Sequence, residues 1–400
     1  MIPVFRAVPP SSAQLAADPG APHLVYLSAS RNILALATSA VGIGIDLSGD
    51  PPRVVVSGAQ LERLADELAG MDATLAGRIR RYLHPVANWM LRTRELQLDR
   101  PQIMGILNLT SDSFSGDGVG AEVSAALRRA GELRDAGASI IDVGAESARA
   151  DRPMLEEEAE AQLVGSVVTA LTREGHLVSS DSYKPLVARA ALESGAEIVN
   201  DISGLTLGAG VAIEAARAAA GYVLNYSYSV PKRRPTVPPH YHDVVAETVG
   251  WMEQRISELE ATGLSHAQIA IDPGIAFGKS HDEDIQVLRR LGELRSAGLP
   301  ILLAHSRKNF IGSINSRPPG DRELETHVVS ALAYEQGARI FRVHDPAGAV
   351  RALEMAAAIA SQSAGRYAPD GVSWPWRAGA SAAHMSSSEP DKAAPEGQRW

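Results

Sequence analysis

Short apolar segments and longer amphipathic segments alternate through the middle of this chain, and this alternation constrains its fold more than any other feature. Apolar runs typical of strands buried on both faces occur at residues 103–110, 139–145, 177–182, 197–202, 221–226, 268–274, 300–306 and 339–345. Apolar residues at helical spacing occur between and after them, at residues 121–136, 155–172, 185–194, 211–220, 243–262, 284–297, 324–336 and 347–360. Several of these helical segments lead into a glycine such as Gly137, which is typical of a helix C-cap.

Eight strand–helix units in this order predict an α/β fold, a (β/α)8 TIM barrel over residues 101–365. A doubly wound open sheet is the alternative architecture. Such sheets often carry a Gly-x-Gly-x-x-Gly turn after the first strand, and this chain has none there. In a barrel the active site lies at the carboxyl ends of the strands, so the residues that follow each strand are the candidates for chemistry.

The two ends of the chain lack this alternation. Residues 1–100 predict a small N-terminal extension domain, which we interpret as a packing or dimerisation module. Its predicted strands and helices are residues 23–27, 53–56, 59–68 and 73–83. Residues 366–400 are rich in Ala, Ser, Pro and Gly, and this composition predicts a disordered, flexible C-terminal tail.

Composition excludes several classes of function. The chain has 400 residues and a formal net charge of -9, which argues against an electrostatic nucleic-acid binder. No apolar run is long enough to cross a bilayer, so we expect no membrane partner. The chain has no cysteine, which excludes disulfides, thiolate metal sites and a cysteine nucleophile, and which suits a cytoplasmic protein.

Polar side chains occur at nearly every predicted strand end. In chain order they are Asn108 and Asp112, Asp142 and Glu146, Asp181, Asn200 and Asp201, Asn225, Asp272, Lys308, Arg342 and His344. Each alone has an ordinary structural explanation, since an aspartate can cap a helix, an arginine can pair with an acid, and a histidine can be held in a core. Together they converge on one mouth, which favours a ligand-binding role for the set.

The chemistry of this set indicates a class of ligand. Acceptors and donors that suit a flat, nitrogen-rich heterocycle are offered by Asp181, Asn200, Asp272 and Lys308. Arg342 and His344 are two residues apart on a strand, so they point the same way and make a natural anion clamp. Asn108 adds a hard oxygen ligand of the kind that Mg²⁺ accepts when phosphate and water fill the rest of its shell. The predicted ligand is a heterocycle that carries a magnesium-bound pyrophosphate.

At these residues the chain resembles dihydropteroate synthase, the folate-pathway family inhibited by sulfonamides. The resemblance covers roughly residues 101–360. Its motifs are Ile103-Met-Gly-Ile-Leu-Asn-Leu-Thr110, Ile140-Ile-Asp-Val-Gly144 with Glu146-Ser147, Ser180-Asp-Ser-Tyr-Lys-Pro185, Asn200-Asp-Ile202, Ile271-Asp-Pro-Gly-Ile-Ala-Phe-Gly-Lys279, Ser306-Arg-Lys308 and Arg342-Val-His-Asp345. The motifs occur in the family's order and extend to individual site residues, which fold-level analogy alone would not supply.

The resemblance implies condensation of 6-hydroxymethyl-dihydropterin pyrophosphate with para-aminobenzoate, both small molecules, to give dihydropteroate and pyrophosphate. It implies Mg²⁺ as cofactor, held by Asn108, and a homodimer in the cytoplasm. The implied substrate-binding residues are Asp181, Asn200, Asp272, Lys308, Arg342, His344, Arg149 and Phe277. The implied catalytic residues are Asn108, Lys308, Arg342 and His344.

The chain departs from the family pattern at several positions. Gly116 stands where the family has a loop aspartate, although Asp117 follows at once, and Ala148 stands in place of a threonine. The family's Met-His-Met-x-Gly is replaced by residues 225–229, and Ala304-His305 replaces Gly-x. In the family the first two loops close over the aminobenzoate, so these departures concern that pocket and leave the pterin side intact.

The departures keep other functions open. One is a paralogue that binds pterin pyrophosphate but uses a different nucleophile or has no catalytic activity. A corrinoid-linked pterin methyltransferase shares the barrel, but the retained pyrophosphate residues Asn108, Arg342 and His344 argue against it. A non-catalytic pterin-binding protein whose N-terminal module contacts a partner is the third alternative.

Overall fold

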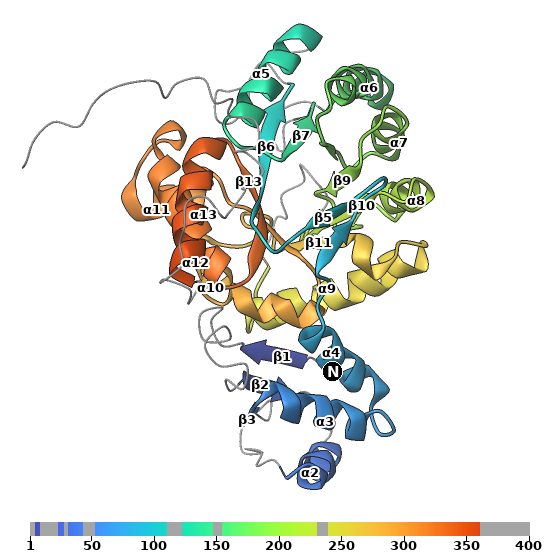
Figure 1. Ribbon diagram of the computed structural model, residues 1–400, viewed down its shortest axis with the longest axis vertical. Coiled ribbons are helices and arrows are strands. Elements are labelled where there is room, and N and C mark those ends of the chain that lie inside the picture. The colour runs from blue at the N-terminus through green and yellow to red at the C-terminus, as the bar shows by residue number, and fades with distance from the viewer. Residues whose placement is uncertain are drawn as a thin grey trace, which may run out of the picture.

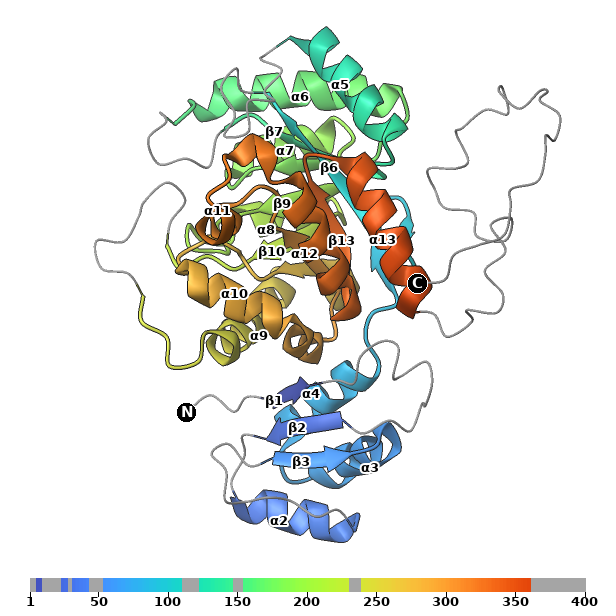
Figure 2. The same ribbon diagram turned by 90° about the vertical axis from the view of Figure 1, so that its left-hand side faces the viewer.

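The computed structural model describes residues 5–8, 23–27, 31–42, 53–109, 122–146, 154–229 and 239–360. Within these residues the chain forms a closed barrel and, below it in Figure 2, a small N-terminal module. The predicted tail at 366–400 lies outside the described residues. Among the helices that are described, none has the length and apolar character needed to cross a membrane.

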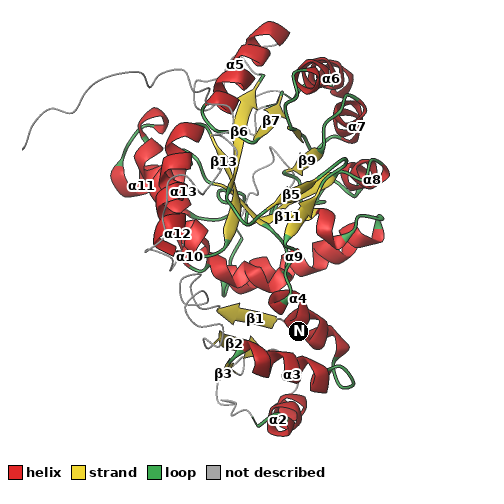
Figure 3. Ribbon diagram, in the orientation of Figure 1, coloured by secondary structure: helices red, strands yellow, loops and turns green. Residues whose placement is uncertain are grey.

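Eight parallel strands close into the barrel, and the helices surround it (Figure 1, Figure 3). The strands are β6 (Gln102–Asn108), β7 (Ile140–Gly144), β8 (Val178–Asp181), β9 (Ile198–Asp201), β10 (Gly221–Asn225), β11 (Ile269–Asp272), β12 (Ile301–Ala304) and β13 (Ala338–Val343). Each pairs with the next along the chain, and β13 closes on β6 with Phe341 opposite Ile103. The (β/α)8 prediction is confirmed. Each strand ends one or two residues before its predicted limit, where the backbone leaves the sheet and the polar loop begins.

The helices of the barrel follow the predicted segments with two differences. They are α5 (Val123–Asp135), α6 (Glu157–Arg173), α7 (Pro185–Glu193), α8 (Gly210–Arg217), α9 (Val244–Ala261), α10 (His281–Arg289), α11 (Asn309–Asn315), α12 (Glu323–Glu335) and α13 (Pro346–Ala360), with 3-10 turns η1 (His266–Gln268), η2 (Leu291–Ala297) and η3 (Pro319–Asp321). The predicted helix at 284–297 is divided between α10 and η2, because Gly292 weakens the helix and its N–H donates to the Gln336 side chain at 3.1 Å. The short α11 was not predicted.

An apolar floor closes the amino ends of the barrel strands. It is built by the hairpin of β4 (Asn88–Met90) and β5 (Glu95–Gln97), which inserts Trp89 and Leu91 beneath inward-facing strand residues such as Leu302. Trp89 is fully buried, and its indole N–H donates to the carbonyl of Gln268 at 2.7 Å. Gly221 at the start of β10 leaves room for the hairpin, since a Cβ there would lie 2.6 Å from Leu91.

The N-terminal module has a sheet and a core of its own. Its elements are β1 (Phe5–Val8), β2 (His23–Leu27), β3 (Arg53–Val56), α2 (Arg31–Ala40), α3 (Gly58–Leu68) and α4 (Ala73–Leu83), with β2 central in an antiparallel sheet. Its helices bury Leu61, Leu64 and Ile79 against one another. The four predicted elements of this region are confirmed, whereas β1, α2 and the hairpin were not predicted.

The module docks on the barrel through buried contacts. Arg78 of α4 forms an ion pair with Glu253 of α9 at 3.0 Å, with both side chains almost fully buried. Burial raises the pKa of Glu253 to about 7, and Arg78 opposes this shift. The backbone N–H of Val86 also donates to the carbonyl of Gly298 at 2.9 Å. The hairpin that follows packs into the barrel floor, so the domain division at residue 100 stays a prediction.

Candidate active site

The structure gathers the polar strand-end residues at the carboxyl end of the barrel, which we call the mouth. The residues that lie in the strands are Asn108, Asp142, Asp181, Asn200, Asn225, Asp272 and Arg342, whereas His344 directly follows β13 and Lys308 lies four residues after β12. Predicted positions that lie outside the described residues are Asp112, Gly116, Asp117, Ala148 and Arg149. Parallel strands deliver their last side chains to one end of a barrel, so residues distant in sequence become neighbours here.

Arg342 joins two carboxylates across the mouth. Its Nε donates to Asp142 Oδ2 and its terminal nitrogen to Asp181 Oδ2, both at 2.6 Å. Asn200 Nδ2 donates to the same Asp142 oxygen at 3.1 Å. Asp142 is fully buried, and its Oδ1 has no hydrogen-bond partner among the described residues. Asp142 thus anchors Arg342 and Asn200, a role that sequence reasoning did not assign.

Burial and neighbouring charges shift the pKa values of the groups in this network. Burial would lower the pKa of Arg342, but Asp142 and Asp181 outweigh it and raise that pKa above the ordinary value. Burial raises the pKa of Asp181 to about 7, with Arg342 opposing the shift. Such shifts gather at sites where charge is held ready for a ligand or a reaction.

Asp272 and Lys308 form the second polar group of the mouth. Asp272 accepts from the backbone N–H of Gly274 at 2.7 Å and from that of Ala304 at 3.2 Å. Lys308 Nζ donates to the carbonyl of Ile275 at 2.7 Å and lies 4.9 Å from the centroid of the Phe277 ring. The aromatic face, the ammonium and the carboxylate therefore come from adjacent segments of the mouth.

Burial changes the titration of this second group. It raises the pKa of Asp272, with Lys308 as the main opposing charge. It lowers the pKa of Lys308 to about 8, with Asp272 opposing. Lys308 therefore loses its proton more readily than an exposed lysine, while it remains charged at neutral pH.

His344 is oriented by Ser306. The serine Oγ lies 2.8 Å from His344 Nδ1 and accepts from the His344 backbone N–H at 3.3 Å. Ser306 was part of a quoted motif, but sequence reasoning gave it no role. The neighbouring His305, one of the departures from the family pattern, is fully buried and contacts the Thr326 carbonyl at 2.9 Å. Burial lowers the pKa of His305 to about 4, so it is a neutral core residue.

One strand-end residue is used differently from the prediction. The expectation that Asp201 belongs to the mouth is wrong, because its carboxylate accepts from Tyr222 Oη at 2.6 Å in the layer outside the barrel. Neighbouring residues of a strand point to opposite faces, so the inward direction of Asn200 turns Asp201 outward. Asn225 is buried and donates to the carbonyl of Tyr226 at 2.8 Å.

Glu146 is held in a buried cluster beside the mouth. Its carboxylate accepts from Lys184 Nζ at 2.7 Å, from Tyr183 Oη at 2.5 Å, and from the backbone N–H of Leu155 at 2.8 Å. Lys184 also donates to Glu160 at 2.6 Å. Lys184 was part of a quoted motif but was given no role, and Glu160 was not predicted, because nothing in their spacing shows that α6 and the start of α7 bring them to Glu146.

Lys279 is a further residue that sequence reasoning missed. Its ammonium donates to the carbonyl of Pro273 at 2.9 Å and lies 3.5 Å from the ring centroid of Tyr226. Burial lowers the pKa of Lys279 to about 7. The motif that contains Phe277 also contains this lysine, which was the available signal. Tyr226 belongs to the segment that departs from the family pattern, and here that segment packs on the loop after β11.

Comparison with known proteins gives the class to which this site belongs. Residues 104–344 match the model of a family described as pterin binding enzyme. The dihydropteroate synthase of Mycobacterium leprae is 38% identical over 263 residues, which cover 64% of this chain and 93% of the relative. That of Escherichia coli K12 is 36% identical over 267 residues, covering 66% of this chain and 94% of the relative.

Solved structures give the same result. The dihydropteroate synthase of Yersinia pestis in complex with a sulfonamide drug superposes with a TM-score of 0.65 and 33% identity, over 68% of this chain and 99% of that chain. The enzyme of Xanthomonas albilineans with 4-aminobenzoic acid superposes with a TM-score of 0.62 and 34% identity, over 68% of this chain and 98% of that chain. Fold and site therefore define a pterin-binding enzyme built on a TIM barrel. More specifically, the chain belongs to the dihydropteroate synthase family, which are transferases of folate biosynthesis.

Proposed function

We propose that this protein condenses 6-hydroxymethyl-dihydropterin pyrophosphate with para-aminobenzoate and releases dihydropteroate and pyrophosphate. The observation that carries the proposal is the mouth, where Arg342, Asp272 and Lys308 bring buried charge to one end of the barrel. Solved relatives named as complexes with 7,8-dihydropteroate and with 4-aminobenzoic acid support these small-molecule substrates. The cysteine-free composition supports a cytoplasmic location.

The pterin is assigned to Asp181, Asn200, Asp272, Lys308 and Phe277. Two backbone N–H groups already orient the Asp272 carboxylate, and a carboxylate has lone pairs left for the amino group and ring N–H of a pterin. The Lys308 ammonium can donate to the carbonyl side of the same ring, and the Phe277 face offers a stacking surface. Arg149, which lies outside the described residues, stays a predicted substrate contact.

The pyrophosphate is assigned to Arg342 and His344. Arg342 has its donors on Asp142 and Asp181, so the guanidinium is oriented before an anion arrives. Asn108 at the end of β6 offers a hard amide oxygen, and one such ligand suits Mg²⁺ when phosphate and water complete its shell. Bound there, Mg²⁺ would neutralise part of the charge on the departing pyrophosphate.

The chain's residues then act by stabilising charge that separates in the reaction. Pyrophosphate departure leaves a positive pterin methylene, and the buried carboxylate of Asp272 and the partly buried carboxylate of Asp181 lie at the mouth where that charge forms. Arg342 and His344 hold the anion that leaves. The aminobenzoate nitrogen attacks the methylene and then loses one proton to solvent, so the chemistry requires positioning and no covalent enzyme nucleophile.

A turnover assay with both substrates tests this function. The account predicts stoichiometric dihydropteroate and pyrophosphate. Arg342→Ala should abolish turnover, whereas Arg339→Ala at the other end of the same strand should retain it, because Arg339 donates to the carbonyls of Tyr334 and Ala338, away from the mouth. If pterin pyrophosphate binds but no product forms, the protein is instead the paralogue with a different nucleophile or no activity, which the altered segment around Tyr226 leaves as the second candidate.

We also propose that the protein is a homodimer formed through α12 and α13. These adjacent helices expose Leu324 and Leu332 of α12 at 71% and 62%, and Met355 and Ile359 of α13 at 63% and 74%. An apolar face on two neighbouring helices suits a two-fold contact with a second copy of the same face.

Light scattering should give twice the chain mass, and Leu332→Glu should give monomers, whereas Ile213→Glu on α8 should not. A monomeric wild-type protein at micromolar concentration would exclude this dimer.

A further inference from the structure

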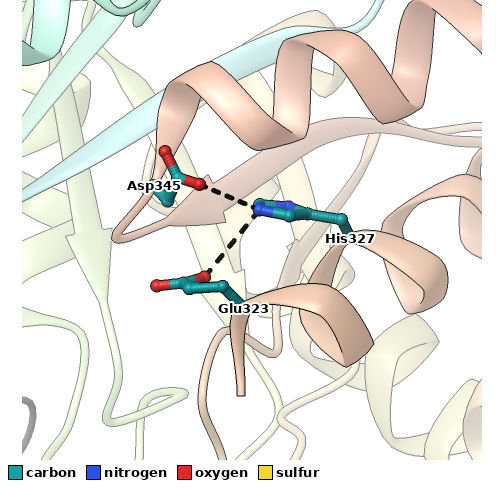
Figure 4. A group of neighbouring side chains, drawn as sticks. All are labelled: Glu323, His327 and Asp345. Atoms are coloured by element: carbon teal, nitrogen blue, oxygen red, sulfur yellow. Dashed lines mark hydrogen bonds and ion pairs between the residues drawn. The ribbon is translucent and has the colours of Figure 1, made fainter. Parts of the chain in front are cut away.

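A histidine and two carboxylates meet beside the mouth, on the side of α12 (Figure 4). Glu323 and His327 are one turn apart on α12, and Asp345 lies in the turn between β13 and α13. His327 Nε2 lies 3.0 Å from Asp345 Oδ2 and 4.0 Å from Glu323 Oε2. One ligand-type atom of each residue lies within 4.8 Å of the other two.

The three side chains carry too few N–H donors to satisfy all of the acceptor atoms that face one another. A neutral imidazole carries at most one proton on Nε2, and that proton can serve the nearer carboxylate, Asp345. Glu323 Oε2 is buried and has no hydrogen-bond partner among the described residues, and the same holds for His327 Nδ1. All polar contacts of the ring in the described structure are therefore made through Nε2, which faces two carboxylates. A cation between the three side chains would satisfy all of the facing atoms.

Gly348 provides the space in which the group is assembled. A Cβ at this position of α13 would lie 2.1 Å from His327 Nε2 and 2.5 Å from Asp345 Oδ2. Any other residue would push the imidazole and the carboxylate away from each other. The glycine backbone is in the ordinary helical region, so it is the space and not the conformation that requires glycine here.

We propose that Glu323, His327 and Asp345 bind a divalent transition-metal cation of the Zn²⁺ class. Imidazole nitrogen with carboxylate oxygen is a ligand set that Zn²⁺ accepts at about 2.0–2.2 Å, whereas Mg²⁺ prefers oxygen alone. Tetrahedral ligands at that bond length are separated by about 3.3 Å. The observed 3.0 and 4.0 Å, with the two carboxylates up to 4.8 Å apart, therefore require Glu323 to move toward the other two ligands. The Asp345 side chain is 39% exposed and leaves a path for the ion and a solvent ligand.

The ion would connect two segments that carry mouth residues. Asp345 directly follows His344, and Glu323 forms an ion pair with Arg307, which directly precedes Lys308. A filled site would therefore tie α12 to the turn after β13 and to the loop after β12. It differs in ligands and in metal preference from the predicted Mg²⁺ position at Asn108.

Calorimetric titration of the metal-free full-length protein with Zn²⁺ tests the proposal, with Co²⁺ absorption as a second readout of the ligand set. We expect one Zn²⁺ per chain and no displacement by millimolar Mg²⁺. Glu323→Gln, which keeps the side-chain shape, and His327→Ala should each weaken binding at least about tenfold. His266→Ala is the matched control, because His266 pairs with Glu260 at 2.8 Å without a third ligand, and it should bind as the wild type does.

Gly348→Ala provides an independent variant, since it alters no ligand but fills the space between two of them. It should weaken Zn²⁺ binding at least about tenfold in a protein whose circular dichroism is unchanged. Absence of stoichiometric Zn²⁺ binding by the wild type would overturn the proposal. So would equal Zn²⁺ affinity in the wild type, Glu323→Gln and His327→Ala.

Discussion

The two ends of the same eight strands lie in two different environments. At the floor, Trp89, Leu302 and Ile340 are buried in an apolar cluster, and the nearby ion pair of Arg94 and Glu197 lies beside the hairpin. At the mouth the strands bury Asp142 and enclose most of Arg342, whose side chain is 16% exposed, and these charges are costly to remove from water. Apolar burial contributes about 25 cal/mol per Å² to stability, whereas a buried ion pair often contributes nothing net. The difference indicates that the floor stabilises the barrel and that the charges of the mouth are kept for a ligand.

Arg342→Ala should have the largest effect on the mouth. It leaves the Asp142 and Asp181 carboxylates buried without their cation, and breaking such a group costs about 3–5 kcal/mol of unfolding free energy. The substitution should also weaken the binding of pterin pyrophosphate far more than the binding of the bare hydroxymethyl pterin, because the guanidinium is assigned to the leaving group. Denaturant titration and calorimetry with both ligands measure the two effects. Equal losses for both ligands would contradict the anion-binding assignment.

Trp89→Ala should destabilise the barrel through the floor and leave ligand binding at the mouth unchanged. Removal of this fully buried ring should cost about 3–5 kcal/mol of unfolding free energy, because a cavity remains beneath the strands. The pterin affinity of the folded fraction should stay within about twofold of the wild type, since Trp89 donates to the carbonyl of Gln268 at the amino end of the barrel, away from the mouth. Calorimetry well below the melting temperature checks this. A large loss of pterin affinity in the folded protein would show that the two ends are not separate in role.

Lys308→Ala should weaken pterin pyrophosphate binding by about 1.5–3 kcal/mol, the range for a hydrogen bond from a charged group. The ammonium lies beside Phe277 and Asp272, where the pterin ring is assigned. Lys184→Ala is not a suitable control because it is buried with two glutamates, so Arg189→Ala on the surface of α7 serves instead. Unchanged affinity in Lys308→Ala, measured by calorimetry, would remove this residue from the site.

The pH dependence of pterin binding should follow Lys308. Its pKa is lowered to about 8 by burial, so the free protein carries the ammonium below pH 8 and loses it as the pH rises through that value. If the charged form binds, the ratio of wild-type to Lys308→Ala pterin affinity should be constant from pH 6 to 7 and fall toward about tenfold per pH unit above 8. Affinity titrations across this range in wild type and Lys308→Ala measure it. A fall of equal size in Lys308→Ala would assign the pH dependence to another group.

The smallest expected effect concerns the second substrate. Ala148, which lies outside the described residues, replaces a threonine of the family pattern, and one neutral hydroxyl contact is worth about 0.5–1.5 kcal/mol. We expect para-aminobenzoate and sulfonamide to bind more tightly to Ala148→Thr combined with Gly116→Asp, with pterin affinity unchanged. Competition binding with a labelled sulfonamide measures this. If the unmodified protein already binds sulfonamide as tightly as pterin pyrophosphate, the pocket is not altered.

Most of the barrel could be predicted because parallel strands are buried on both faces and therefore appear as continuous apolar runs. The strand at residues 103–110 and the helix at 347–360 are examples, found within two residues of β6 and α13. The α11 helix was missed because its seven residues, Asn309–Asn315, are too few for helical periodicity to emerge. The break between α10 and η2 depends on a long-range bond from Gly292 to Gln336 that local sequence does not reveal.

The site could be predicted as a list of residues but not as a network. Polar residues at strand ends are visible in the sequence, yet the pair Arg342–Asp142 joins positions 200 residues apart. The outward turn of Asp201 follows from strand register, which polar character alone does not give. The spacing of Glu323 and His327 was visible too, but the approach of Asp345 depends on how α12 packs against the turn after β13.

The most direct test of the central claim is a crystal structure of the protein with pterin pyrophosphate. We expect density for the pterin at the mouth, with its amino edge within hydrogen-bond distance of the Asp272 carboxylate and its carbonyl side near Lys308. We also expect Arg342 and His344 to contact the pyrophosphate. A pterin bound elsewhere on the barrel, or at the mouth without contact to Asp272 and Lys308, would contradict the account.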